Sequence, residues 1–407
     1  MDLTQADKDA VSARHKDAAA RMDQLRGRNL SLDMTRGKPS PEQLDLADDL
    51  LTCVAHGETK SEDGTDLRNY GGLAGIPEAR RLFAEFLGTE PDRVIVGGNS
   101  SLTMMWDVLA NAMSFGMPDG DGPWRDQAPK FICPVPGYDR HFAICERLGI
   151  EMINVEMTPD GPDLDAVRAL AAEDASVKGI WCVPKYSNPS GETYTDETVE
   201  ALASMPAAAK DFRIMWDNAY AVHHLGNGPA SLGDIMTACE KAGNGNRAIV
   251  FGSTSKITHA GAGVAVMASS PDNVKDHLDK IFYAMIGPDK INQMRHVRFF
   301  KDMNGILEHM KKHAEIVAPK FAAVDEALEK ALGGTGLATW TKPEGGYFVS
   351  VDVLDGCAKK IIKRCADAGV KITPAGATYP YGKDPHDRNI RIAPTLPSVD
   401  EIKGAMT

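Results

Sequence analysis

One lysine of this sequence stands where its amine could act as a nucleophile. Lys256 lies within FGSTSKITHAGAGVAV, residues 251–266, after the hydrophobic run AIVFG and among Ser, Thr, Gly and Ala. A lysine that is partly withdrawn from water has a lowered pKa, and its free amine can attack a carbonyl carbon to form a Schiff base. Because most lysines lie in exposed loops, this interpretation needs support from other residues.

Polar side chains that could share such a site follow five short apolar runs. The runs are VIVGG, KFICPV, GIWCVP, RIMWDN and AIVFG. In open α/β sheets, ligands bind outside the carboxyl ends of the strands, so residues at these positions are expected to meet. They are Asn99, Ser100 and Ser101 after the first run, Tyr138 after the second, Asn188 after the third, Asp217 and Tyr220 at the fourth, and Ser253, Ser255 and Lys256 after the fifth.

Taken together, these residue types fit one ligand. The serines of GGNSS open an expected helix, whose N-terminal N–H groups suit a phosphate, although Asn99 or Ser100 could simply cap that helix. Asp217 ends an apolar strand, where a carboxylate is costly unless it is paired; it could be a structural cap or hold a cationic ring nitrogen. Tyr138 could stack on a flat ring or be an ordinary loop aromatic. A phosphate, a cationic ring and an aldehyde for Lys256 together describe pyridoxal phosphate.

The elements that must position these residues are strands alternating with helices. Helix-like stretches lie between most of the apolar runs, which indicates a mostly parallel seven-stranded sheet covered on both faces. The predicted fold class is therefore α/β, with this sheet in a large domain that spans residues 46–295. The predicted strands are residues 94–98, 130–135, 151–156, 179–184, 213–218, 248–252 and 263–269.

A smaller α+β domain is expected from the rest of the chain. Residues 289–332 are mostly helical in pattern and charged, and two apolar runs, 345–354 and 389–396, predict strands. Ser398 and Glu401 predict a capping box at the start of the final helix. Residues 4–27 predict an amphipathic helix. We expect residues 1–45 and 296–407 to form this second domain.

Composition excludes several classes of partner. The chain has 407 residues and a net charge of −12 with both signs interspersed, which argues against nucleic acid or an anionic membrane surface. It has no apolar run of about 18 residues that could span a membrane. Its seven cysteines lack the paired spacing of a zinc site, so no metal is expected and a reduced, cytoplasmic setting is the simple interpretation. This composition suits a protein that handles small molecules.

The motifs give the chain a resemblance to a known family over nearly its whole length. It resembles fold-type I pyridoxal-phosphate enzymes, specifically class I/II aminotransferases, and is most similar to the aspartate aminotransferase subgroup related to MocR-type regulators. The resemblance is carried, in order, by NYGGLAGIPEAR, GGNSS, PVPGY, SNPSG, WDNAY, STSK, PEGGYF and NIRIAPT. It implies pyridoxal 5′-phosphate as the cofactor and a homodimer with its active site at the subunit interface.

The resemblance also implies roles around the cofactor ring. Lys256 would carry the cofactor as a Schiff base, and Asp217 would keep the ring nitrogen protonated. Asn188 and Tyr220 would hydrogen-bond the ring 3′-oxygen, with Asn188 also near the substrate, and Tyr138 would stack on the ring.

The expected phosphate site departs from the family pattern. Similar enzymes commonly carry a phosphate-binding arginine about eight residues after the lysine, where this chain has HAGAGVAV. Thr258, His259 or glycine N–H groups could replace it, and the sequence does not choose among them. The remaining phosphate contacts would come from Asn99, Ser100, Ser101, Ser253, Ser255 and, across the dimer interface, Tyr70.

The implied reaction moves an amino group between small molecules. An L-amino acid would pass its amino group to the cofactor and then to 2-oxoglutarate by ping-pong kinetics, with Lys256 as general base. Arg391 would bind the substrate α-carboxylate through its planar fork, and the Gly37 backbone would close over the substrate. Aspartate is the expected donor, which requires a cation for its second carboxylate. The candidates are Arg36, Lys38, Lys290 and Arg295.

Three alternatives stay open at this point. The substrate could be alanine, an aromatic amino acid or an aminoadipate-type acid. The enzyme could be a pyridoxal-phosphate lyase or decarboxylase, which would need no 2-oxo acid. A regulatory domain that binds the cofactor without turnover is disfavoured, since barely 30 residues precede TRGKP and the charge is wrong for DNA.

Overall fold

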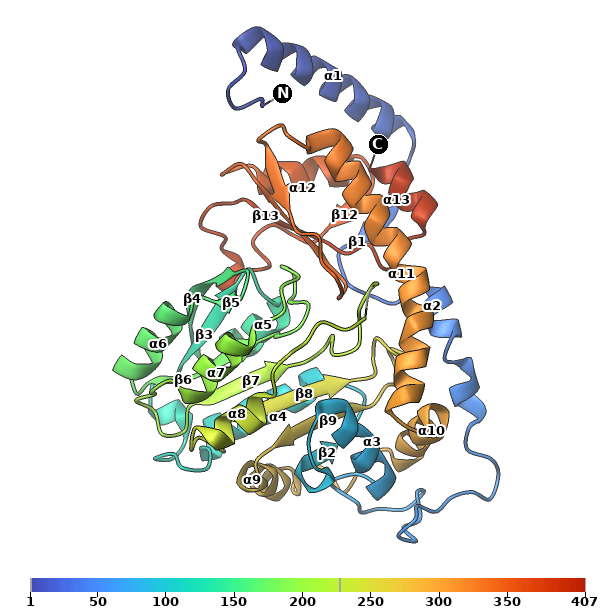
Figure 1. Ribbon diagram of the computed structural model, residues 1–407, viewed down its shortest axis with the longest axis vertical. Coiled ribbons are helices and arrows are strands. Elements are labelled where there is room, and N and C mark those ends of the chain that lie inside the picture. The colour runs from blue at the N-terminus through green and yellow to red at the C-terminus, as the bar shows by residue number, and fades with distance from the viewer. Residues whose placement is uncertain (1, 227, 407) are drawn as a thin grey trace.

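The computed structural model describes residues 2–226 and 228–406, and its centre is an eight-stranded sheet (Figure 1). All seven predicted strands are present, and a two-residue strand, β5, extends one edge beyond the prediction. The spatial order is β2 (Val94–Val96), β9 (Ala265–Ser269), β8 (Ala248–Ser253), β7 (Arg213–Asp217), β6 (Val177–Cys182), β3 (Lys130–Val135), β4 (Glu151–Thr158) and β5 (Gly161–Pro162).

Strand direction in this sheet is mixed around a parallel centre. Strands β4, β3, β6, β7 and β8 run parallel, whereas β9 pairs antiparallel with both β8 and β2. Every residue of β6 and β7 is buried. This explains why their sequences are continuous apolar runs, because helices cover both faces of the sheet. The predicted α/β class is confirmed.

Two apolar clusters fill the space between the sheet and its helices. One face is covered by α4 (Ser101–Phe115), α5 (Asp139–Leu148) and α9 (Pro271–Ile281). The opposite face is covered by α3 (Pro77–Leu87), α6 (Leu164–Glu173), α7 (Asp196–Ser204), α8 (Ile235–Lys241), α10 (Lys290–Phe300) and the first part of α11 (Met303–Leu332).

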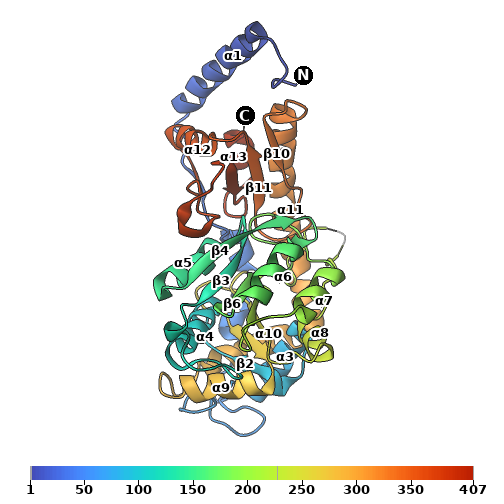
Figure 2. The ribbon, with the colours of Figure 1, turned by 90° about the vertical axis from the view of Figure 1, so that its left-hand side faces the viewer.

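A second, smaller core lies beyond the carboxyl ends of the parallel strands (Figures 1 and 2). It contains the antiparallel sheet β10 (Ala338–Trp340), β11 (Val349–Val353) and β13 (Asn389–Ile392), packed with α12 (Ala358–Asp367), α13 (Val399–Ala405) and the end of α11. The N-terminal segment joins it, because β1 (Leu32–Met34) pairs in parallel with β12 (Val370–Ile372). The predicted capping box at Ser398 and Glu401 is present.

One predicted domain limit falls at the end of a helix, and the other falls inside a helix. Residue 45 is the last residue of the short helix α2 (Pro41–Asp45), whereas the limit between residues 295 and 296 lies inside α10. The long helix α11 then contributes to both cores, with Ile306 in the larger and Val324 in the smaller.

The first helix, α1 (Lys8–Gly27), differs from the expected amphipathic helix. None of its residues, all of which the structure describes, is buried. It stands apart from the smaller core in Figure 2, and flanking residues tie it down: Leu3 N donates to Thr335 O at 2.8 Å and Arg28 Nη1 donates to Gly404 O at 2.8 Å. Within the described residues, no helix combines the length and apolar character of a membrane span.

Candidate active site

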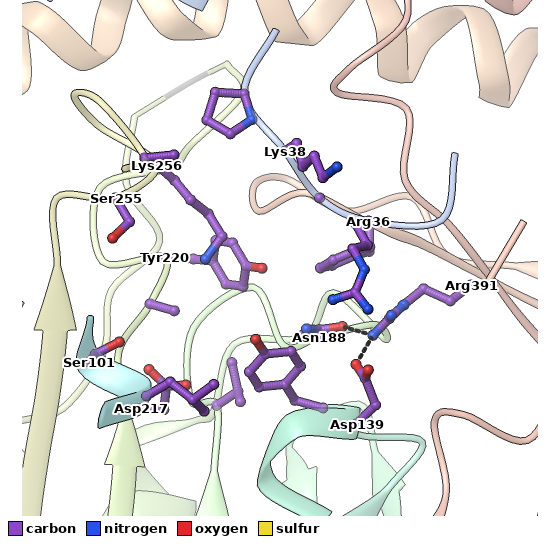
Figure 3. Close-up of a pocket in the computed structure, with 18 of the residues that line it drawn as sticks. Arg36, Lys38, Ser101, Asp139, Asn188, Asp217, Tyr220, Ser255, Lys256 and Arg391 are labelled. Carbon is purple, nitrogen blue, oxygen red and sulfur yellow. Dashed lines mark hydrogen bonds and ion pairs between the residues drawn. The ribbon is translucent and has the colours of Figure 1, made fainter. Parts of the chain in front are cut away.

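A cavity of about 250 Å³ opens where the ends of the parallel strands face the segment of residues 36–39 (Figure 3). It brings together most of the residues that the sequence singled out, although they come from segments far apart in the chain. The predicted residues that line it are Arg36, Gly37, Lys38, Ser101, Tyr138, Asn188, Asp217, Tyr220, Ser255, Lys256 and Arg391.

Lys256 follows β8 and extends into this cavity (Figure 3). Burial lowers the pKa of its amine, and the negative charge of Asp217 opposes that shift in part. Its Nζ lies 5.0 Å from the centre of the Tyr220 ring. A lysine in this setting holds its amine in the unprotonated, nucleophilic form more readily than an exposed lysine does.

The backbone around Lys256 is held by a buried histidine on α10. His296 Nδ1 lies 2.8 Å from the Asn292 carbonyl and must donate to it, so Nε2 accepts hydrogen bonds of 3.0 Å from the hydroxyls of Thr254 and Thr258. Because these two threonines lie on either side of Lys256, the contact fixes the turn that carries the lysine.

A second group of buried side chains contacts the same turn from α2, α11 and the loop before β11. Tyr347 Oη donates to the Lys256 carbonyl at 3.2 Å and accepts a 2.9 Å hydrogen bond from Gln43. His309 Nε2 lies 2.7 Å from the Ile257 carbonyl and can donate to it. Lys256 is therefore anchored to elements of both cores.

Asp217 ends β7 with only 3% of its surface exposed. Its Oδ2 lies 2.9 Å from Nε2 of His141, whose ring stacks on Trp181 at a centroid distance of 4.1 Å. Its Oδ1 has no hydrogen-bond partner among the described residues. A buried carboxylate oxygen without a partner is unfavourable, and a protonated ring nitrogen would satisfy it, so the site fits the predicted cofactor.

Two tyrosines close the space around Asp217. Burial raises the pKa of Tyr138 to about 12, with a further contribution from the charge of Asp217. Burial also raises the pKa of Tyr220 well above its usual value. Both phenols therefore stay protonated at neutral pH and can act as hydrogen-bond donors or as apolar ring surfaces.

Arg391 lies on β13 at the other end of the cavity and is 4% exposed. Its Nη1 donates to Oδ1 of Asp139 at 3.0 Å and to Oδ1 of Asn188 at 3.2 Å. Its guanidinium lies 4.8 Å from the centre of the Phe348 ring. The Gly37 backbone also packs here, so closely that a Cβ would come within 2.8 Å of Phe348.

The serines and Asn99 separate into two groups. Ser101 and Ser255 line the cavity, at the start of α4 and beside Lys256. Ser100 is instead the N-cap of α4, since its Oγ accepts from Thr103 N at 3.2 Å. Asn99 donates through Nδ2 to the Gly261 carbonyl at 2.9 Å, and Ser253 ends β8 without lining the cavity.

The stretch that lacks the expected arginine contributes little to the cavity. Thr258 is fully buried and bonded to His296 and Thr254, so it does not reach the cavity. His259 Nε2 faces Oδ1 of Asp48 at 3.5 Å. Ala260 lines the cavity, and it offers only its backbone to an anion.

Three remaining predicted residues lie outside the cavity. Tyr70 is 78% exposed. Lys290 is buried and donates to the carbonyls of Asn69 and Gly71 at 2.7 and 2.8 Å, so it fixes the segment that carries Tyr70. Arg295, on α10, does not line the cavity either. Arg36 and Lys38 are thus the two of the four candidate cations that face the site.

Two polar residues in direct contact with Arg391 and Asp217 were missed from the sequence. Asp139 and His141 follow Tyr138 in PGYDRHF, directly after β3. The strand-end rule that selected Tyr138 would have reached them had it been carried three residues further.

Comparison with known proteins gives a consistent result. Residues 6–407 match the family model described as aspartate amino-transferase. The chain is 47% identical to the aspartate aminotransferase of Corynebacterium glutamicum, over 100% of this chain and 94% of that protein. A crystal structure of an aspartate transaminase from C. glutamicum superposes with a TM-score of 0.97 at 47% identity, covering 100% of this chain and 96% of that one.

More distant structures share the fold alone. The α-aminoadipate aminotransferase of Thermus thermophilus, complexed with N-(5′-phosphopyridoxyl)-L-leucine, has a TM-score of 0.75 at 20% identity, covering 92% of this chain and 90% of that one.

Proposed function

Because this chain belongs to the aspartate aminotransferase family and is an aminotransferase, we propose that it uses pyridoxal 5′-phosphate to move the amino group of L-aspartate to 2-oxoglutarate. One observation carries the proposal: a half-buried lysine whose amine has a lowered pKa, an unpartnered buried aspartate oxygen and a buried arginine share one cavity. These three groups match an aldehyde, a protonated ring nitrogen and a carboxylate.

The cofactor, when bound, supplies an aldehyde for the amino group and a ring that withdraws electrons from the substrate α-carbon. Lys256 Nζ would hold the aldehyde covalently as a Schiff base, and its amine would serve as the base that moves the proton at the substrate α-carbon. Its lowered pKa supports the role of base. Asp217 holds a proton on the ring nitrogen, and His141 keeps the Asp217 carboxylate in place.

Other residues hold the two ligands. Ser101, Ser255 and the N–H groups at the start of α4 bind the phosphate, since an anion is favoured at a helix N-terminus. Arg391 and Asn188 bind the substrate α-carboxylate. Arg36 and Lys38 supply positive charge for the second carboxylate of a dicarboxylic substrate, which is the feature that favours aspartate over alanine or an aromatic donor.

The proposal includes a homodimer in which Tyr70 reaches the phosphate of the neighbouring subunit. The support is the exposure of Tyr70 next to other exposed large apolar side chains, Phe282, Tyr283 and Ile286. Gly287 packs against Gly71, so the two segments lie side by side. A cytoplasmic setting is supported by the seven cysteines, all of which are described and free.

Absorption spectroscopy with Lys256→Ala tests the central assignment. The purified protein mixed with pyridoxal phosphate is expected to show the visible band of covalently bound cofactor, and Lys256→Ala is expected to lack that band because it has no amine. A wild-type protein that binds no pyridoxal phosphate would contradict the whole proposal.

A panel of amino donors then tests the substrate. Aspartate should be the preferred donor with 2-oxoglutarate as acceptor, and turnover should stop without a 2-oxo acid. If the enzyme does not use aspartate as a donor, only the proposed substrate is contradicted. Turnover without any 2-oxo acid would indicate a lyase instead.

A further inference from the structure

The arginine that faces the substrate end of the cavity already has a carboxylate partner in this chain. Asp139, the first residue of α5, accepts a 3.0 Å hydrogen bond from Arg391 Nη1 (Figure 3). Both side chains line the cavity. The Arg391 side chain is 4% exposed, whereas that of Asp139 is 28% exposed.

The other side chains in direct contact with the Arg391 guanidinium are uncharged. Nη1 also donates to Asn188 Oδ1, Nε lies 3.4 Å from Thr373 Oγ1, and the Phe348 ring covers one face. Asp139 is the acidic side chain that forms an ion pair with Arg391 among the described residues. The two other cations that line this end, Arg36 and Lys38, form no ion pair within the described part of the chain.

We propose that Asp139 is a built-in competitor for Arg391, which lowers the affinity of the site for carboxylate substrates and products. This inference rests on the proposed function, in which Arg391 binds the substrate α-carboxylate. Asp139 is an affinity-setting residue and takes no part in proton transfer.

Arg391 depends on Asp139 for its counter-charge within this chain. A guanidinium as buried as Arg391 is unfavourable without a counter-charge, and Asp139 provides one before substrate arrives. Asp139 engages only Nη1, so Nη2 can still donate to an incoming carboxylate. The bound state then places two carboxylates on one guanidinium, and their repulsion weakens binding relative to a site without the Asp139 charge.

Such weakening suits a ping-pong enzyme. Each half-reaction must release a carboxylate product from the same arginine before the next substrate binds. Tighter binding of substrate and transition state alike lowers KM without raising kcat, and slow product release limits many enzymes. A partly exposed aspartate is able to keep Arg391 aligned without holding the product.

Calorimetric titration with succinate, a four-carbon dicarboxylate without an amino group, measures this effect directly. Asp139→Asn removes the charge and keeps an oxygen that accepts from Arg391. We expect this variant of the cofactor-loaded protein to bind succinate about five- to tenfold more tightly than wild type at low salt, with a smaller gain at high salt. Glu146→Gln, an exposed charge removed from the same helix, should leave the Kd unchanged.

Two further measurements separate this inference from the proposed function. Arg391→Leu should abolish most succinate binding, and Asp139→Asn should give no gain in that background. If Arg391→Leu binds succinate as well as wild type does, the proposed role of Arg391 fails. If Arg391→Leu loses binding but Asp139→Asn leaves the Kd unchanged or higher, the role of Asp139 as a competitor is overturned. In steady state, Asp139→Asn should lower KM for both substrates more than it changes kcat.

Discussion

The two carboxylate oxygens of Asp217 lie in different environments, which gives this residue its chemistry. Oδ2 is held by His141, and Oδ1 has no partner among the described residues. The stacking of His141 on Trp181 limits movement of the pair. A charge fixed in this way can hold a proton on a ligand ring nitrogen without reorganising during the reaction, which is how buried charges stabilise transition states.

Replacement of Asp217 by asparagine should therefore affect the reaction far more than the fold. Asp217→Asn keeps the size and one oxygen but removes the negative charge. We expect kcat/KM to fall by about 100- to 1000-fold, since this is the usual loss when a fixed electrostatic contact at a reacting centre is removed. Steady-state kinetics with aspartate and 2-oxoglutarate would measure it.

Asp217→Glu is the matched control for the Asp217 charge. It retains the carboxylate and should recover part of the activity. Equal loss in both variants would mean that shape, rather than charge, is what the reaction requires of Asp217.

At the scale of elements, α10 stabilises the turn that carries the reactive lysine. Burial lowers the pKa of His296 to about 4, well below its value in an unfolded chain, about 6.5. Between these two pH values the unfolded chain binds a proton that the folded chain does not. The stabilisation from neutral His296 is therefore fully present above about pH 6.5 and is lost as the pH falls toward 4.

The pH dependence of unfolding tests this contribution. Cofactor-free protein should lose stability between pH 7 and 4.5, and in His296→Gln this loss should be smaller by about 2 kcal/mol. Denaturant titrations at several pH values would give the free energy of unfolding. His15→Gln, on the exposed helix α1, should show the wild-type dependence. An unchanged slope in His296→Gln would contradict the assignment.

The elements differ in how well the sequence predicted them. The seven longer strands of the large sheet could be located from their apolar residues, which form mostly buried runs in all of them except β4, where only Met152 and Val155 are buried. Strand β5 was missed, since its two residues, Gly161 and Pro162, carry no strand pattern and pair only because β4 lies beside them. Helix α1 has a helical pattern, but nothing in that pattern tells whether another surface covers its apolar side chains.

At the scale of the whole molecule, we propose that a second copy of the chain completes the site. Tyr70 lies outside its own chain's cavity and is held near the surface by the contacts of Lys290 with its neighbours. A symmetric dimer places the same surface on both subunits, so each copy would supply its Tyr70 to the other.

Mixing two inactive variants tests this arrangement. Tyr70→Ala and Lys256→Ala, dissociated together and reassociated at equal amounts, should regain about a quarter of wild-type activity. Half of the dimers would be hybrids, and each hybrid has one site with an intact Lys256 and an intact Tyr70. Recovery measured by the aspartate assay, with size-exclusion chromatography to follow exchange, would show sharing. Confirmed exchange without recovery would mean that Tyr70 does not act across the interface.

The sequence by itself determined the chemistry that this chain can perform and the fold that carries it. Lys256, Asp217 and Arg391 were identifiable because unusual residue types stand at strand ends or within family motifs. Their neighbours were decided by the tertiary structure. Asp139 meets Arg391 across 252 residues of sequence, and His141 meets Asp217 across 76. Local periodicity reports which face of an element is buried, but contacts between distant segments depend on the order in which the strands pair.

Likewise, the polar residues of NSS after β2 look alike in sequence. Only the backbone direction at the start of α4 turned Ser101 into the cavity and left Ser100 to cap the helix.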